Sequence, residues 1–339
     1  MNEHPPDGPE WKWPAGVSRR CVFACLLAVA VGQAPVRALE APTAANSNGV
    51  LRLGFSSSVF VGVNENDAKA ATKVWAQTIL LEHGATVVAE PTVLNGREAI
   101  ASAVRNKLVD AVTMTAEEYW VLGGEFMSTN AVLGANGGLA TEEYLLLVHR
   151  DSNIGRIDDL RGRSLIFFEN GRASLAPVWF ETLLLKSGLG QTSQFCGRVI
   201  QGTKLSQVVL PVFFRQADAC VVTRRGFQTM VELNPQVGQQ LKTLVSSPAM
   251  VPVAFLFRAD YSDPVRDRIV AEIEKVHSSV AAQQVLTLFQ CENLQVRPVS
   301  ALDTALELLA THGRLSEAAT QAELARTNVT LATVKTGVP

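Results

Sequence analysis

Polar side chains gather where the short apolar runs of this 339-residue sequence end. They carry hydroxyl groups or a positive charge, and they are Ser56, Ser57, Ser58, Thr113, Thr115, Arg172, Ser174, Thr203, Lys204 and Thr223. Each stands at or just after the end of a predicted strand, and the residues from Arg172 to Ser174 and from Thr203 to Lys204 also stand at or before the start of a predicted helix. Ligands of open α/β sheets bind beyond the carboxyl ends of the strands, where helix N-termini present free N–H groups. The set therefore predicts a binding site for a small anion.

The two cations of the set, Arg172 and Lys204, give the more specific signal. A positive charge at a helix N-terminus opposes the helix macrodipole, and an anion beside it relieves that conflict. Two plainer interpretations stay open. Serine and threonine are also ordinary N-cap residues, and either cation is compatible with a solvated surface charge.

The elements that must position these side chains alternate between short apolar runs and amphipathic stretches. The predicted strands cover residues 50–54, 86–89, 111–114, 164–168, 196–200 and 219–222. The predicted helices between them cover residues 67–83, 96–106, 174–187 and 205–214. In addition, Thr115 and Glu118 match a capping box that opens a further short helix. Two βαβ units of similar plan predict an α/β protein with two lobes, each a mainly parallel sheet flanked by helices.

The order of these elements suggests how the chain divides between the lobes. We expect residues 50–146 and 253–314 to form lobe 1, residues 147–252 to form lobe 2, and residues 315–339 to form a C-terminal tail. The apolar strands near residues 144–150 and 246–257 are predicted to cross between the lobes. Two such crossings would serve as a hinge.

The first 38 residues have the features of a secretory signal peptide. Arg19 and Arg20 precede an apolar run at residues 21–31, and small residues ending at Ala38 form a plausible cleavage site. The run is shorter than the roughly 20 residues of a membrane span. We therefore expect export to the periplasm, by either the general secretory or the twin-arginine route.

Removal of this segment would leave Cys196, Cys220 and Cys291, an odd number, so at least one thiol stays unpaired within the chain. A Cys196–Cys220 disulfide is compatible with an exported protein.

Composition narrows the function further. The 30 Lys and Arg against 32 Asp and Glu give a formal charge of −2, which argues against a nucleic-acid-binding surface. No CxxC or HExxH motif and no nucleophile elbow or phosphate-binding loop occurs in the sequence. Neither a metal, nor another cofactor, nor an enzymatic activity is expected.

Several segments resemble the phosphate- and phosphonate-type periplasmic substrate-binding proteins of ABC transporters, which share the type II periplasmic-binding-protein fold. They are residues 50–55, 98–114, 159–162, 202–204 and 247–252. The resemblance spans about residues 50–314. The family's Ser-Thr-Ser-Gly phosphonate loop corresponds roughly to residues 171–174 of this chain. Because the two sequences differ there, the ligand stays open.

The resemblance implies an exported, monomeric binding protein that closes two lobes on a small anionic ligand. It further implies delivery of that ligand to an ABC permease in the inner membrane. A receptor that presents its closed form to a membrane sensor kinase is the alternative, and an enzyme on the same two-lobed fold is less expected.

Overall fold

The computed structural model describes residues 49–61, 64–82, 87–278, 283, 286–287 and 289–336. The predicted signal peptide at residues 1–38 lies outside the described residues. The chain divides into two units, Met1–Ala45 and Asn46–Pro339, and every described element belongs to the second.

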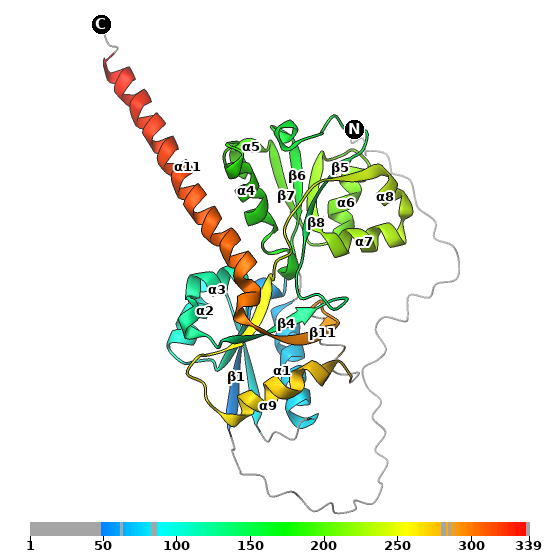
Figure 1. The fold of residues 1–339 in the computed structure, drawn as a ribbon, viewed down its shortest axis with the longest axis vertical. Coiled ribbons are helices and arrows are strands. Elements are labelled where there is room, and N and C mark those ends of the chain that lie inside the picture. The colour runs from blue at the N-terminus through cyan, green and yellow to red at the C-terminus, as the bar shows by residue number, and fades with distance from the viewer. Residues whose placement is uncertain are drawn as a thin grey trace, which may run out of the picture. The chain divides into compact units, whose positions relative to one another are not determined.

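The first sheet has the strand order β11-β4-β10-β3-β1-β2 (Figure 1). Its strands are β1 (Val50–Ser56), β2 (Val88–Leu94), β3 (Ala111–Thr115), β4 (Asn130–Ala135), β10 (Val253–Phe257) and β11 (Asn293–Pro298). Strand β1 pairs in parallel with β2 and β3. Strand β10 is antiparallel to β3 and β4, and β11 is antiparallel to β4. Strands β1 to β4 therefore point one way, and the two strands from late in the chain point the other way.

The second sheet has the strand order β7-β6-β8-β5-β9. Its strands are β5 (Tyr144–His149), β6 (Ser164–Phe168), β7 (Arg198–Gly202), β8 (Ala219–Thr223) and β9 (Leu241–Ser246). Strand β6 pairs in parallel with β7 and β8, whereas β5 is antiparallel to β8 and β9. Only β5 runs against the direction of its neighbours in this sheet.

The predicted α/β fold with two sheets is confirmed, with two refinements. The sheets are mixed, because β5, β10 and β11 run against the parallel strands. Strand β5 also lies wholly in the second sheet, so the chain passes between the sheets at residues 136–143 rather than within the predicted 144–150. It returns at residues 247–252, inside the second predicted crossing.

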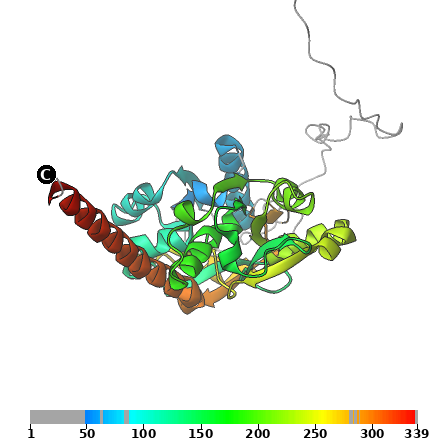
Figure 2. The ribbon, with the colours of Figure 1, turned by 90° about the horizontal axis from the view of Figure 1, so that it is seen from above.

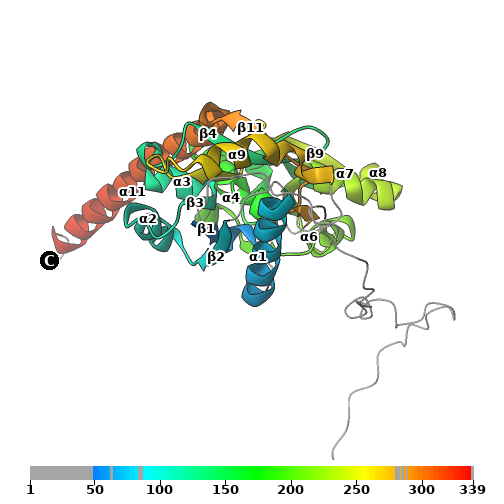
Figure 3. The same cartoon turned by 90° about the horizontal axis from the view of Figure 1, so that it is seen from below.

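Helices flank both sheets (Figure 3). They are α1 (Glu65–Glu82), α2 (Arg97–Arg105), α3 (Ala116–Leu122), α4 (Ala176–Lys186), α5 (Thr192–Phe195), α6 (Leu205–Phe213), α7 (Arg224–Leu233), α8 (Pro235–Gln240), α9 (Pro264–Glu272) and α11 (Asp303–Thr336). Helix α3 opens with the predicted capping box of Thr115 and Glu118. None of the helices in the described ranges combines the length and the apolar character that crossing a bilayer requires.

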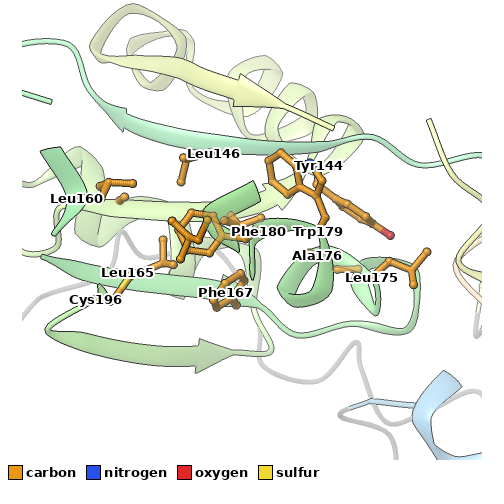
Figure 4. Close-up of a cluster of buried hydrophobic side chains, with 14 of the residues drawn as sticks. Tyr144, Leu146, Leu160, Leu165, Phe167, Leu175, Ala176, Trp179, Phe180 and Cys196 are labelled. Carbon is orange, nitrogen blue, oxygen red and sulfur yellow. The ribbon is translucent and has the colours of Figure 1, made fainter. Parts of the chain in front are cut away.

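A buried aromatic cluster holds α4 against the second sheet (Figure 4). The rings of Phe167 and Phe180 meet edge to face with their centroids 5.8 Å apart, and Tyr144 packs beside Trp179. The Tyr144 hydroxyl donates a hydrogen bond of 3.1 Å to the carbonyl oxygen of Arg172. Burial raises the pKa of Tyr144, so this donor keeps its proton. The cluster thereby fixes the turn that precedes α4.

Helix α11 contacts both halves of the fold (Figures 1 and 2). Leu302, just before it, is buried with the first sheet, whereas Ala305 and Leu309 are buried with the cluster on α4. The sequence analysis assigned the start of this segment to lobe 1 and residues 315–339 to a separate tail. In the structure one continuous helix covers both stretches as far as Thr336.

Farther along α11, His312 lies 3.2 Å from the carboxylate of Glu181 on α4. Burial alone would raise the pKa of Glu181, but hydrogen bonds from the Thr192 backbone N–H and from His312 outweigh it. The pKa of this carboxyl group is therefore lowered.

Candidate ligand-binding site

A pocket opens between the first sheet and the turn that precedes α4. Its floor comes from β3, β4 and β10 through side chains such as Thr113, Val132 and Phe255. One wall is the 3₁₀ turn η4 (Gly171–Ala173) of the second half, and a further part of the lining consists of Leu286, Phe289, Gln290, Cys291 and Leu294. The empty volume is about 660 Å³ including the mouth. We call it the apolar pocket, because aliphatic and aromatic side chains make up most of its lining.

Arg172 supplies the positive charge of this pocket. The residue is 9% exposed. Its Nε donates to Oε1 of Glu142 at 2.5 Å, and its Nη1 donates to the carbonyl oxygen of Gly134 on β4 at 3.1 Å. Its Nη2 is buried and has no hydrogen-bond partner among the described residues. Because an unpaired buried donor is costly, this nitrogen is poised to donate to an acceptor that enters the pocket.

A second, polar pocket shares Arg172 with the apolar pocket. It has an empty volume of about 590 Å³, and Glu142, Thr223 and Arg225 line it. Asn170, Arg172 and Gln290 line both pockets. Arg172 thus lines both an apolar and a polar pocket, and it contacts both sheets.

The turn that carries Arg172 is held close to the first half of the fold. A Cβ atom on Gly171 would come within 2.7 Å of the carbonyl oxygen of Val59, so only glycine fits without displacing the backbone. The Asn170 side chain caps the turn by accepting from the Arg172 N–H at 2.8 Å. The hydroxyl of Ser174, just after the turn, is buried without a partner in the described part of the chain.

Further side-chain contacts hold the segment before β11 beside the pockets. Asn170 donates to Oε1 of Gln290 at 2.5 Å, and Asn136 donates to the carbonyl oxygen of Gln290 at 2.8 Å. Arg225 on α7 forms an ion pair with Glu292, just before β11. These contacts close the second half over the segment that walls the apolar pocket.

The hydroxyl residues at the end of β1 form a separate group around a carboxylate. Ser56 and Ser58 both donate to Oε1 of Glu118, at 2.6 and 3.0 Å, while the N–H of Thr115 donates to Oε2 at 2.8 Å. Ser57 lies between them in the 3₁₀ turn η1 (Ser57–Val59) and is half-buried. Glu118, itself buried, thus occupies the donors that the sequence assigned to a bound anion.

The remaining predicted site residues are spread around the second half. Thr223 is buried, caps α7 by accepting from the Gly226 N–H at 3.1 Å, and lines the polar pocket. Thr203 and Lys204 are exposed at the start of α6 and line neither pocket. The structure therefore brings Thr113 and Arg172 together at the apolar pocket and places Lys204 outside it.

Several residues of this region carry no clear signal in the sequence. Glu142 follows no strand end or motif, so nothing marked it as the partner of Arg172. Glu118 was visible only as part of a capping box. Cys291 lines the apolar pocket, although it was considered only for disulfide pairing.

All three described cysteines are free, so the Cys196–Cys220 disulfide is not formed. Burial raises the pKa of both Cys196 and Cys291 to about 11. Within the described ranges, no cluster of three or more His, Cys, Asp or Glu side chains is arranged to hold a metal ion.

Comparisons with known proteins place this architecture. The structural match to XAC2383 from Xanthomonas citri bound to ATP covers 79% of this chain and 98% of that one, with a TM-score of 0.58 and 17% sequence identity. The match to the binding protein component of an ABC phosphonate transporter from Pseudomonas aeruginosa covers 86% of this chain and 98% of that one, with a TM-score of 0.55 and 16% sequence identity. The match to PhnD1 from Prochlorococcus marinus in complex with methylphosphonate covers 77% of this chain and 97% of that one, with a TM-score of 0.52 and 13% sequence identity. At these identities the three structures are similar to this chain in fold.

No match to the chain is found among curated protein sequences. A family model is decisive instead. Residues 59–300 match the model described as ABC transporter, phosphonate, periplasmic substrate-binding protein, and this range is most of the chain. The family consists of transport binding proteins rather than enzymes. The chain therefore belongs to the periplasmic substrate-binding proteins of phosphonate-type ABC transporters.

Proposed function

We propose that this protein binds a small anion at the guanidinium of Arg172, between its two sheets, and delivers it to an ABC permease. The observation that carries the proposal is the buried Nη2 of Arg172, a residue that lines both pockets; this nitrogen has no acceptor among the described residues. Hydrogen bonds to a charged group are worth about 1.5–3 kcal/mol each. An anionic oxygen at this nitrogen would complete its hydrogen bonding.

Arg172 also explains how binding would be coupled to closure. The residue belongs to the second half, yet its Nη1 already contacts Gly134 of the first sheet. A ligand that bridges Arg172 and the floor of the apolar pocket would stabilise the arrangement in which the halves meet. Closure around ligands is a common transition of two-lobed binding proteins. A permease that distinguishes the closed form would then take the ligand from it.

The proposal includes export of the chain and removal of residues 1–38. The support is the basic, apolar and small-residue pattern of that segment. N-terminal sequencing of protein recovered from the periplasm tests this part, and an intact Met1 there would contradict it.

The binding site is tested by calorimetry with a panel of small anions on the full mature chain. The informative comparison is Glu142→Gln against Arg172→Met/Glu142→Gln, because neither leaves a buried carboxylate unpaired. Loss of the guanidinium in the second variant should cost about 2–5 kcal/mol in binding.

Lys204→Met is the matched control, since it removes an exposed cation outside both pockets. Its affinity should stay within about 1 kcal/mol of the wild type. Equal affinities of the two Glu142→Gln proteins would contradict the assignment of Arg172. A large loss in Lys204→Met would favour the anion site that the sequence placed at α6.

A further inference from the structure

The apolar pocket also constrains which anion fits, and this inference rests on the proposed function of Arg172. Beyond Arg172, its polar lining side chains are Thr113, Asn170 and Gln290, and the last two already hydrogen-bond each other. The walls are apolar side chains from β4 and β10, together with Val59, Ile273, Leu286, Phe289 and Leu294. A ligand in contact with Arg172 on this side must place most of its remaining surface against hydrocarbon.

The charges around Arg172 are already balanced before a ligand binds. Its guanidinium is paired with Glu142, whose side chain is 6% exposed, and Arg225 at the polar pocket is paired with Glu292. A bound monoanion leaves this buried region with one excess negative charge, and a dianion leaves it with two. Each uncompensated charge in a buried site is costly, so a singly charged ligand is favoured.

The hydroxyl residues at the end of β1 do not provide further donors for a doubly charged ligand. The side chains of Ser56 and Ser58 donate to the carboxylate of Glu118, as does the N–H of Thr115. A group with three charged oxygens would therefore find one guanidinium nitrogen, Nη2, as its available charged donor. One or two acceptor oxygens match this supply better than the three oxygens of a doubly ionised phosphonate.

We propose that the pocket takes an amphipathic monoanion, with its charged group at Nη2 of Arg172 and an alkyl or aryl body among Val132, Phe255 and Leu294. The pairing with Glu142 sets the preference for a single charge, and the apolar walls set the preference for a hydrocarbon body. This assigns the substrate class of the site by charge and apolar area.

The test separates charge from apolar area with four ligands on the full mature chain. They are methanesulfonate, hexanesulfonate, methylphosphonate and hexylphosphonate, measured by calorimetry at mildly alkaline pH, where phosphonates are dianions. Affinity should rise about fourfold for each methylene group that enters the pocket. At equal chain length the sulfonate should bind about tenfold more tightly than the phosphonate.

Two variants and one control localise the effects. Val253→Thr places a hydroxyl group in the pocket wall and should weaken hexanesulfonate binding about fivefold. Val245→Thr is the matched control, a half-buried strand valine on β9 outside the pocket, and should change the affinity by about twofold or less. Glu142→Gln removes the compensating charge and should shift the preference toward hexylphosphonate about tenfold.

The outcomes are distinguishable. Tightest binding of hexanesulfonate, weakened by Val253→Thr, supports the inference. Binding of methylphosphonate as tight as that of hexanesulfonate, or no gain with chain length, overturns the inference and leaves the proposed anion site intact. Failure of the folded protein to bind any of the four ligands overturns the proposed function as well.

Discussion

The buried pair of Arg172 and Glu142 should dominate the stability of the region between the sheets. Their side chains are 11% and 6% exposed, and Nε lies 2.5 Å from Oε1. Arg172→Met leaves the Glu142 carboxylate buried without its partner. Breaking a buried pair from one side typically costs about 3–5 kcal/mol in the free energy of unfolding. We expect a loss of this size.

The double variant Arg172→Met/Glu142→Gln should recover most of that loss. It removes both charges, and replacing a whole buried pair by neutral groups is often close to neutral in stability. We expect it to lie within about 2 kcal/mol of the wild type and above the single variant Arg172→Met. The loss in the double variant should then be smaller than the sum of the two single losses by at least about 1 kcal/mol.

Urea unfolding of the ligand-free protein, followed by circular dichroism, measures these differences. Lys204→Met is the control for loss of a cation at an exposed position and should change stability by about 0.5 kcal/mol or less. Strictly additive effects of the two substitutions would refute the reasoning. So would an Arg172→Met protein as stable as the wild type.

Three further predictions concern the contacts around this region. Glu118→Ala leaves the buried Ser56 hydroxyl without its acceptor and removes a capping box, so urea unfolding should show a loss of about 2 kcal/mol; an unchanged midpoint would contradict this role. Because the pKa of Glu181 is lowered on folding, its stabilisation is present above the unfolded-state pKa and is lost as pH falls through the folded-state pKa. Glu181→Gln should therefore melt below the wild type at neutral pH and converge with it in acid; parallel curves would argue against this. Glu292→Gln removes the exposed ion pair with Arg225, so calorimetry should show ligand affinity a few-fold weaker and melting should show little loss of stability; an unchanged affinity would show that the pair does not assist closure.

The part of the fold that the sequence predicted is the part that local patterns determine. Strand β6 matches the predicted range, because its apolar run is bounded by turn signals on both sides. The predictions for β3 and β8 differ from the structure by one residue at the end. Strands β4, β9 and β11 were missed. Their pairing joins segments far apart in the chain, as between β4 and β11, and β9 and β11 are only partly buried, so they lack a clear alternation.

Of the candidate site, Arg172 could be predicted from the sequence, whereas the residues around it could not. Arg172 stood out because a cation at a turn before a helix conflicts with the macrodipole. Lys204 gave the same signal, yet α6 begins at the surface, and only the three-dimensional arrangement separates the two. Much of the apolar wall comes from β4, β10, Leu286 and Leu294, which no local pattern connects with Arg172. Glu142 becomes the partner of Arg172, and Glu118 that of Ser56, only when the chain folds.

A ligand that enters the apolar pocket beside Arg172 should shield the residues that line it, and thiol labelling tests this most directly. Cys291 lines the pocket, whereas Cys196 lies in the core beneath α4. Both are 6% exposed, and burial raises the pKa of each to about 11, so the two thiols form a matched pair. Peptide mapping of maleimide-labelled protein gives the rate at each site. Saturating hexanesulfonate should slow labelling of Cys291 and leave that of Cys196 unchanged, and equal rates at Cys291 with and without bound ligand would contradict the account.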